Sequence, residues 1–202
     1  HTPAQKHSYD RGADVIDEDS DRDVTENRTV ITGDVLHSEP LVIRYIYADN
    51  TSKTMVYFGA NDGMLHAVLD ITDPNVNVLN DETDFGTEAW AFIPPDQLPR
   101  LKDMVEGASH QYYVDASPKA YFHDIDKDGV VDSVDGDQVV LICGLRSGGT
   151  GYFALDVTDP LVPQFLWRID RSNSETGILE LNPSIYVNNG GSFQDGDPLR
   201  IW

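Results

Sequence analysis

The run GYFALDVTDP at residues 151–160 decides the fold, because a close counterpart, MLHAVLDITDP, stands at residues 64–74. Both runs are rich in β-branched, aromatic and small apolar residues, which is typical of a strand. Both also end in an Asp-x-Thr-Asp-Pro turn, at Asp70 to Pro74 and at Asp156 to Pro160. The same turn after the same kind of run predicts an internal repeat.

The repeat extends outward from these two runs. The first copy covers residues 37–93, the second covers residues 115–169, and the start of a third occupies residues 181–202, opening with LNPSIYV. We expect four strands in each complete copy, with a proline before the first strand and a tryptophan in the last. The residues that mark these positions are Pro40, Pro118, Trp90 and Trp167.

Four antiparallel strands per repeat, with recurring aromatic and glycine residues, are the pattern of a β-propeller blade. The predicted fold class is therefore all-β, with two complete propeller-like blades of the quinoprotein-dehydrogenase kind and the start of a third. An ordinary β-sandwich with chance similarity is the alternative. Two blades and a fragment cannot close a ring that typically needs at least four. We therefore expect the remaining blades of the parent chain beyond Trp202, or pairing with another chain, and both ends of the sequence read as cuts through a longer protein.

For the segments outside the strands, the sequence predicts loops, turns and one short helix. Residues 1–30 are polar and acidic, which predicts a solvated lead-in segment. Residues 96–106 alone have helical character, because their apolar side chains recur on one face. Asn61-Asp62-Gly63 predicts a hairpin turn. The glycine-rich run at residues 146–151 opens no helix, so it predicts a hairpin loop and not a phosphate cradle.

The composition excludes several classes of partner. The chain has 35 acidic and 14 basic residues in 202, a formal net charge of −21. This charge repels phosphate backbones and anionic lipids, so nucleic acid and membrane surfaces are poor partners. Cys143 is the single cysteine, which rules out a disulfide within the chain, and its apolar run predicts a small buried side chain. No apolar run approaches the ~20 residues of a membrane span.

One motif, the acidic loop at residues 124–135, indicates a cation-binding function. Asp124, Asp126 and Asp128 stand at positions 1, 3 and 5 of an EF-hand-like loop, and Gly129 at position 6 permits the sharp turn. Carboxylates at this spacing converge on one point because the loop curls around it. The predicted Ca²⁺ ligands are Asp124, Asp126, Asp128, the Val130 carbonyl, Asp132 and Asp135.

The loop departs from an EF-hand at position 12, where Asp135 replaces the usual glutamate and its reach to the ion is shorter. Without flanking helices, a structural calcium loop between two strands fits better than a sensor that opens helices. The alternative is an acidic Asp-Gly turn without an ion. Asp137 continues the acidity and could add a ligand.

No catalytic arrangement can be defended from spacing. The histidines are scattered, and His37 and His66 are expected in packing or surface roles. Neither a Ser/His/Asp order nor a catalytic pair of carboxylates is evident. The sequence therefore predicts a protein that is not an enzyme.

Four stretches together resemble the C-terminal propeller domain of PilY1-type proteins, the calcium-binding factors of bacterial type IV pili. They are GDVLHSEP at residues 33–40, VYFGANDGMLHA at residues 56–67, YYVDASP at residues 112–118 and the run at residues 151–160. The family's calcium loop also matches position by position at Asp124, Asp126, Asp128, Val130 and Asp132.

This resemblance implies a cell-surface or pilus-tip protein that promotes pilus assembly, adhesion and twitching motility, with calcium acting at the loop. Its implied partners are minor pilin components of the pilus and a host or abiotic surface. One alternative is a fragment of a PQQ-type quinoprotein dehydrogenase, whose blades usually end in Thr-Gly-Lys before the tryptophan, unlike these. Another is a purely structural propeller segment.

Overall fold

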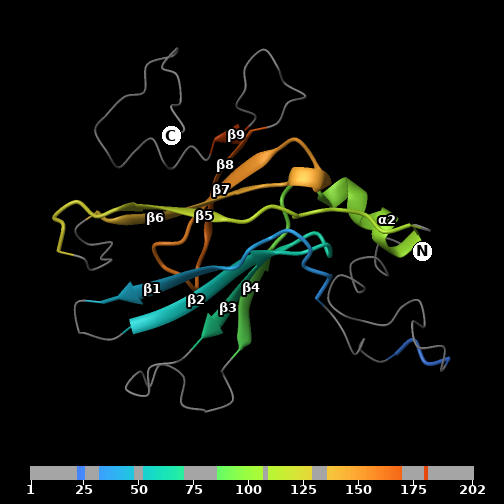
Figure 1. The fold of residues 1–202 in the computed structure, drawn as a ribbon, viewed down its shortest axis with the longest axis horizontal. Coiled ribbons are helices and arrows are strands. Elements are labelled where there is room, and N and C mark those ends of the chain that lie inside the picture. Colours follow the sequence, from blue (N-terminus) through green and yellow to red (C-terminus); the bar gives the residue numbers. More distant parts are fainter. Residues whose placement is uncertain are drawn as a thin grey trace.

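The computed structural model describes residues 22–25, 32–47, 52–70, 86–106, 109–128, 136–169 and 180–181. In this part of the chain the strands form two antiparallel sheets that lie face to face, as Figure 1 shows. Most of the expected lead-in segment, and residues 182–202 of the expected third blade, lie outside the described residues.

The first sheet contains four strands in sequence order. They are β1 (Leu41–Ile46), β2 (Ser52–Gly59), β3 (Leu65–Asp70) and β4 (Thr87–Phe92), and each pairs antiparallel with the next. The turn at Asn61-Asp62-Gly63 joins β2 to β3, as expected, and Gly63 adopts a φ of +94°, which disfavours a residue with a side chain. This meander is the predicted first blade.

The second sheet repeats the arrangement and adds a short fifth strand. Its strands are β5 (Lys119–His123), β6 (Gln138–Gly144), β7 (Tyr152–Asp156), β8 (Gln164–Ile169) and β9 (Glu180–Leu181), again in sequence order. The expected third copy begins at residue 181, but β9 pairs with β8 and so lies at the edge of the second sheet. The glycine-rich run joins β6 to β7, as predicted, and includes a 3₁₀ turn at Arg146–Gly148.

The two sheets share a bulge at the same place. Ala67 pairs with Trp90 while Val68 pairs with Glu88, so one residue of β4 has no partner on β3. The second sheet shows the same shift, because Ala154 pairs with Trp167 while Leu155 pairs with Phe165. A bulge directly before the tryptophan in both sheets confirms the repeat at the level of strand register.

The core fills the space between the sheets. In β1, residues alternate between buried and exposed, as a strand with one covered face requires. The core consists of the inward side chains of both sheets, chiefly Ile43, Tyr45, Met55, Tyr57, Leu65, Ala67, Leu69, Val139, Leu141, Cys143, Phe153 and Leu155. Cys143 is 1% exposed, as predicted, and burial raises the pKa of its thiol to about 12.

The sheets pack head to tail. Phe153 contacts Phe92 of the first sheet, with ring centroids 5.3 Å apart. Its neighbour Ala154 therefore faces away from the first sheet, because successive side chains of a strand point to opposite faces. The equivalent alanine of the first sheet, Ala67, faces the second sheet in the core. The front of one repeat thus covers the back of the next, as blades do in a propeller.

A short helical connection links the sheets, as expected for residues 96–106. It consists of a 3₁₀ turn at Leu98–Arg100 and the helix α2 at Leu101–Glu106. Arg100 ties this connection to the second sheet, because its guanidinium donates to the carbonyl oxygens of Gly148 and, at 3.0 Å, of Tyr112. No helix among the described residues is long and apolar enough to cross a membrane.

Candidate metal centre

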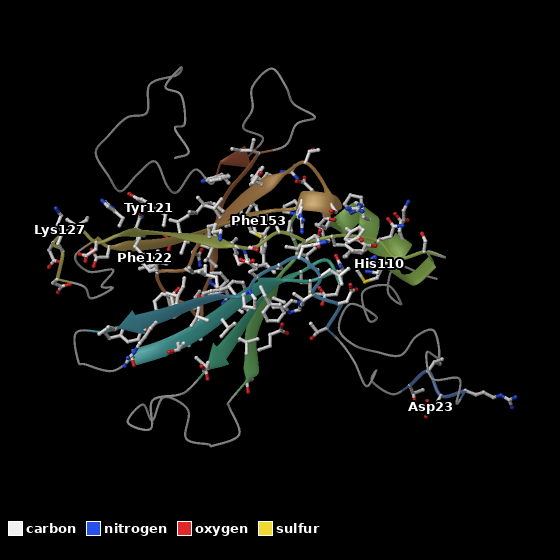
Figure 2. The ribbon with its side chains drawn as sticks, in the orientation of Figure 1. Asp23, His110, Tyr121, Phe122, Lys127 and Phe153 are labelled. Carbon is white, nitrogen blue, oxygen red and sulfur yellow. The ribbon has the colours of Figure 1, made fainter. Side chains whose placement is uncertain are left out.

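The acidic loop connects β5 to β6 at the end of the second sheet. These strands pair from Lys119 opposite Ile142 to His123 opposite Gln138, so the two ends of the loop start side by side. In Figure 2, Lys127 marks the loop at the opposite end of the molecule from His110. The described first part of the loop, residues 124–128, therefore lies away from the connection between the sheets.

The structure brings three of the predicted ligands together. Asp124, Asp126 and Asp128 each offer one carboxylate oxygen, and these oxygens all lie within 4.8 Å of one another. Asp124 is half-buried while Asp126 and Asp128 are exposed. The other predicted ligands, Val130, Asp132 and Asp135, lie outside the described residues.

Backbone bonds hold the first half of the loop in a curl. The amide of Lys127 donates to Oδ1 of Asp124 at 2.6 Å, and the amide of Asp128 donates to Oδ1 of Asp126 at 3.2 Å. Lys127 has a φ of +63°, the left-handed conformation that reverses the chain direction at this point. These turns direct successive carboxylates toward the same side of the loop.

Asp137 anchors the far end of the loop. Its side chain is buried, and its Oδ1 accepts a bond from the amide of Ile125 at 2.8 Å. Gly136 precedes it with a φ of +89°. This carboxylate, which the sequence offers as a further ligand, thus closes the base of the loop against its first residues.

The donor set fits a hard divalent cation. All three gathered side chains are carboxylates, the ligands that Ca²⁺ prefers, and Lys127 supplies the single positive charge of residues 124–128. Two like charges about 4 Å apart repel by about 1 kcal/mol even in bulk water. An ion between the carboxylates would remove this repulsion. Mg²⁺ fits less well, because it demands near-octahedral geometry and keeps its waters.

A second charged cluster surrounds His66, for which the sequence predicted only a packing or surface role. Nε2 of His66 lies 2.9 Å from Oδ2 of Asp62, and Nδ1 contacts Glu88 of β4. Burial opposes a charge on the 4%-exposed ring, but the bonds from Asp62 and Glu88 outweigh it and raise the pKa of His66 to about 9. Asp62 also accepts the amide of Gly33 at 2.8 Å. This cluster is a structural clamp, since both ring nitrogens contact carboxylates.

The spacing of Asp62 and His66 within the NDGMLHA run was the available signal for this clamp. Glu88 could not be assigned to it, because 22 residues separate the two side chains along the chain.

Two repeated sheets that pack head to tail, with an acidic loop between two strands of the second, define a β-propeller-type module with a candidate cation site. The comparison with models of protein families supports the assignment to a β-propeller class. Residues 35–193 match the profile described as the PilY1 beta-propeller domain. The chain belongs to this family.

Curated relatives bear similar names. The chain is 34% identical over 178 residues to the type IV pilus biogenesis factor PilY1 of Pseudomonas aeruginosa strain PAO1, covering 75% of this chain and 13% of that protein. It is 34% identical over 200 residues to the PilY1 of strain UCBPP-PA14, covering 85% and 15%. A PilY1 homolog from Xylella fastidiosa is 32% identical over 173 residues, covering 75% and 12%. The chain thus spans less than a sixth of the length of these relatives.

Among solved structures, the Pseudomonas aeruginosa PilY1 C-terminal domain matches with 37% identity and a TM-score of 0.37. The match covers 61% of this chain and 20% of that one.

Proposed function

We propose that this chain is a non-enzymatic, calcium-binding module of a cell-surface or pilus-tip protein that promotes type IV pilus assembly, adhesion and twitching motility. Membership of the PilY1 propeller family supports the role in pilus biogenesis, since the curated relatives are named type IV pilus biogenesis factors. The observation on which the calcium part rests is the convergence of three carboxylates within 4.8 Å in the β5–β6 loop.

In this proposal the carboxylates of Asp124, Asp126 and Asp128 would hold Ca²⁺, and Val130, Asp132 and Asp135 would complete the set of ligands. The bound ion would fix the loop at the end of the second sheet, where Asp137 already holds its base. A rigid loop at the surface can then contact another component of the pilus, while a loop without its ion would spread under its own charge. Calcium therefore controls the contact through the order of the loop.

The residues that distinguish this repeat from a quinoprotein blade have structural roles. Asp156 caps its own turn, since its Oδ1 accepts the amide of Thr158 at 2.9 Å. Oγ1 of Thr158 in turn accepts the amide of Val139 at 3.0 Å, which joins the turn to β6. In the second copy this turn thus serves blade folding, which favours a binding module over a dehydrogenase. A purely structural segment remains the second candidate, and calcium dependence separates the two.

The proposed partners are minor pilin components, a host or abiotic surface, and further propeller blades of the parent chain. The location is the cell surface, in association with the pilus. The net charge of −21 favours a basic contact surface on such partners.

A complementation experiment tests this function. The native locus of the parent protein is replaced by a variant with Asp128→Asn, and surface pili are counted in 1 mM and in chelated calcium. We expect the wild type to lose pili on chelation, and the variant to have few pili in both media. Asp103→Asn, an exposed aspartate of α2 outside the loop, is the matched control and should behave as the wild type. Equal piliation of wild type and Asp128→Asn in both media would contradict the proposal.

A further inference from the structure

The stretch that leads into the first sheet lies beside the stretch that leads into the second, and two histidine–aspartate pairs join them. Nδ1 of His37 lies 2.9 Å from both carboxylate oxygens of Asp115. Nε2 of His110 lies 3.0 Å from both carboxylate oxygens of Asp34. Each stretch therefore supplies one acid and one base to a reciprocal arrangement.

The two pairs differ in burial. The side chain of Asp115 is 1% exposed, while that of His37 is 38% exposed. The His110 and Asp34 side chains are 45% and 47% exposed. An ion pair at such an exposed position contributes little to the stability of the folded protein. A buried carboxylate, by contrast, is strongly destabilising when its charged partner is lost. The pair of His37 and Asp115 is therefore the one that decides whether the two stretches stay together.

The repeat explains why these two residues meet. His37 and Asp115 each stand three residues before the proline that precedes the first strand of their sheet, Pro40 and Pro118. They are equivalent positions of two adjacent repeats that carry opposite charge types. An interaction between equivalent positions of neighbouring repeats links the two blades directly.

The charged groups around the imidazoles are few. His37 faces Asp115 and the ring of Tyr112, whose centroid is 6.0 Å away. His110 faces Asp34 and the same Tyr112 ring, whose centroid is 5.0 Å away. His110 also lines a pocket of about 160 Å³ together with Asp103. Burial alone would raise the pKa of Asp34, but its bonds with His110 and Asn61 lower it, so this carboxylate stays charged near neutrality.

The other direct hydrogen bonds between the two stretches do not depend on pH in this range. The amide of Glu39 donates to Oγ of Ser117 at 2.9 Å, and Oγ of Ser117 donates to the carbonyl oxygen of His37 at 3.5 Å. Any change in the contact between pH 5.5 and 8 must therefore come from the histidines.

We propose that His37 and Asp115 form a proton-operated latch between the two blades, which holds residues 33–40 against residues 109–117 when His37 is protonated and loosens when it is not. Of the two kinds of side chain in the pair, only the imidazole belongs to the class that changes charge between pH 5 and 8. The latch is thus closed at the acidic end of this range and weakens toward its alkaline end. This inference does not depend on calcium or on the pilus.

Amide hydrogen exchange at pH 5.5 and 8.0, corrected for the intrinsic pH dependence of exchange, tests the latch on the full chain. The peptides of interest cover residues 33–40 and 109–117, with β6 as the internal reference for global folding. We expect protection in both stretches to fall about tenfold from pH 5.5 to 8.0, the effect of losing one charge-assisted hydrogen bond, while β6 is unchanged.

His37→Gln keeps a donor for Asp115 but cannot be protonated, so its two stretches should show the same protection at both pH values. His123→Gln, which alters an exposed histidine of β5, is the control and should retain the pH response. If His37→Gln loses the protection of β6, Asp115→Asn replaces it, since it removes the acid with little change of shape. A wild-type chain with no pH response, or a substituted chain that keeps the full response, would overturn the proposal.

Discussion

At the scale of single residues, His66 is the side chain whose environment differs most from its appearance in the sequence. It lies in a strand and is buried, as a packing residue would be, yet it contacts a carboxylate at each ring nitrogen. The ring also stacks on Phe58, with centroids 5.1 Å apart. The charged ring links the β2–β3 turn to the edge strand β4, because it contacts Asp62 in the turn and Glu88 in the strand.

His66→Gln should therefore destabilise the protein in a pH-dependent way. Because the folded-state pKa of His66 is raised from 6.5 to about 9, its contribution is fully present below pH 6.5 and is lost as the pH rises through 9. We expect the variant to lose about 2 kcal/mol of unfolding free energy at pH 6, and much less at pH 10.

Urea unfolding of the wild type and of His66→Gln across pH 6 to 10 measures this difference. His123→Gln is again the control and should match the wild type throughout. A deficit in His66→Gln that stays constant over the whole range would show that packing, and not charge, is what the histidine supplies.

At the scale of elements, the sequence predicted the strands well and their long-range partners poorly. The Asp-x-Thr-Asp-Pro turn and the prolines located both meanders, because local chemistry determines where a strand ends. The place of β9 could not be predicted, since pairing at the edge of a sheet depends on the neighbouring strand. The same limit applied to His37 and Asp115, which meet across 78 residues of chain.

The acidic loop shows the same difference between local features, which the sequence predicted, and long-range contacts, which it did not. Spacing alone indicated that Asp124, Asp126 and Asp128 converge, and the structure places them together. Spacing did not reveal that Asp137 closes the base of the loop, because its bond to the amide of Ile125 depends on how β5 and β6 pair.

The tryptophan of each repeat gives a test at this scale. Nε1 of Trp90 donates to the carbonyl oxygen of Pro160 at 2.8 Å, so the first sheet is bonded to the turn of the second. Trp90→Phe keeps an aromatic ring but removes this donor, and should cost about 1 kcal/mol in urea unfolding.

Trp167→Phe is the matched comparison, because the indole N–H of Trp167 has no hydrogen-bond partner among the described residues. It should cost less than ~0.5 kcal/mol. A larger loss for Trp167→Phe than for Trp90→Phe would contradict the assigned role of the bond to Pro160.

At the scale of the whole molecule, the two sheets of the described residues stack as successive blades and do not close a ring. Tyr121 and Tyr152 of the second sheet are 57% and 56% exposed, whereas the equivalent Ile43 and Leu65 of the first are 3% and 0% exposed. The first sheet has its front face covered by the second. The front face of the second sheet presents aromatic side chains in the same positions, which fits a further blade as the neighbour.

The central claim is that this propeller module binds calcium through the loop between β5 and β6. The most direct test is calorimetric titration of the chelator-stripped chain with CaCl₂, beside Asp128→Asn and the control Asp103→Asn. The account predicts a one-site isotherm for the wild type and the control, with a dissociation constant of roughly 10⁻⁴ to 10⁻³ M or tighter, and none for Asp128→Asn. No binding heat and no thermal stabilisation of the wild type at millimolar calcium would contradict it.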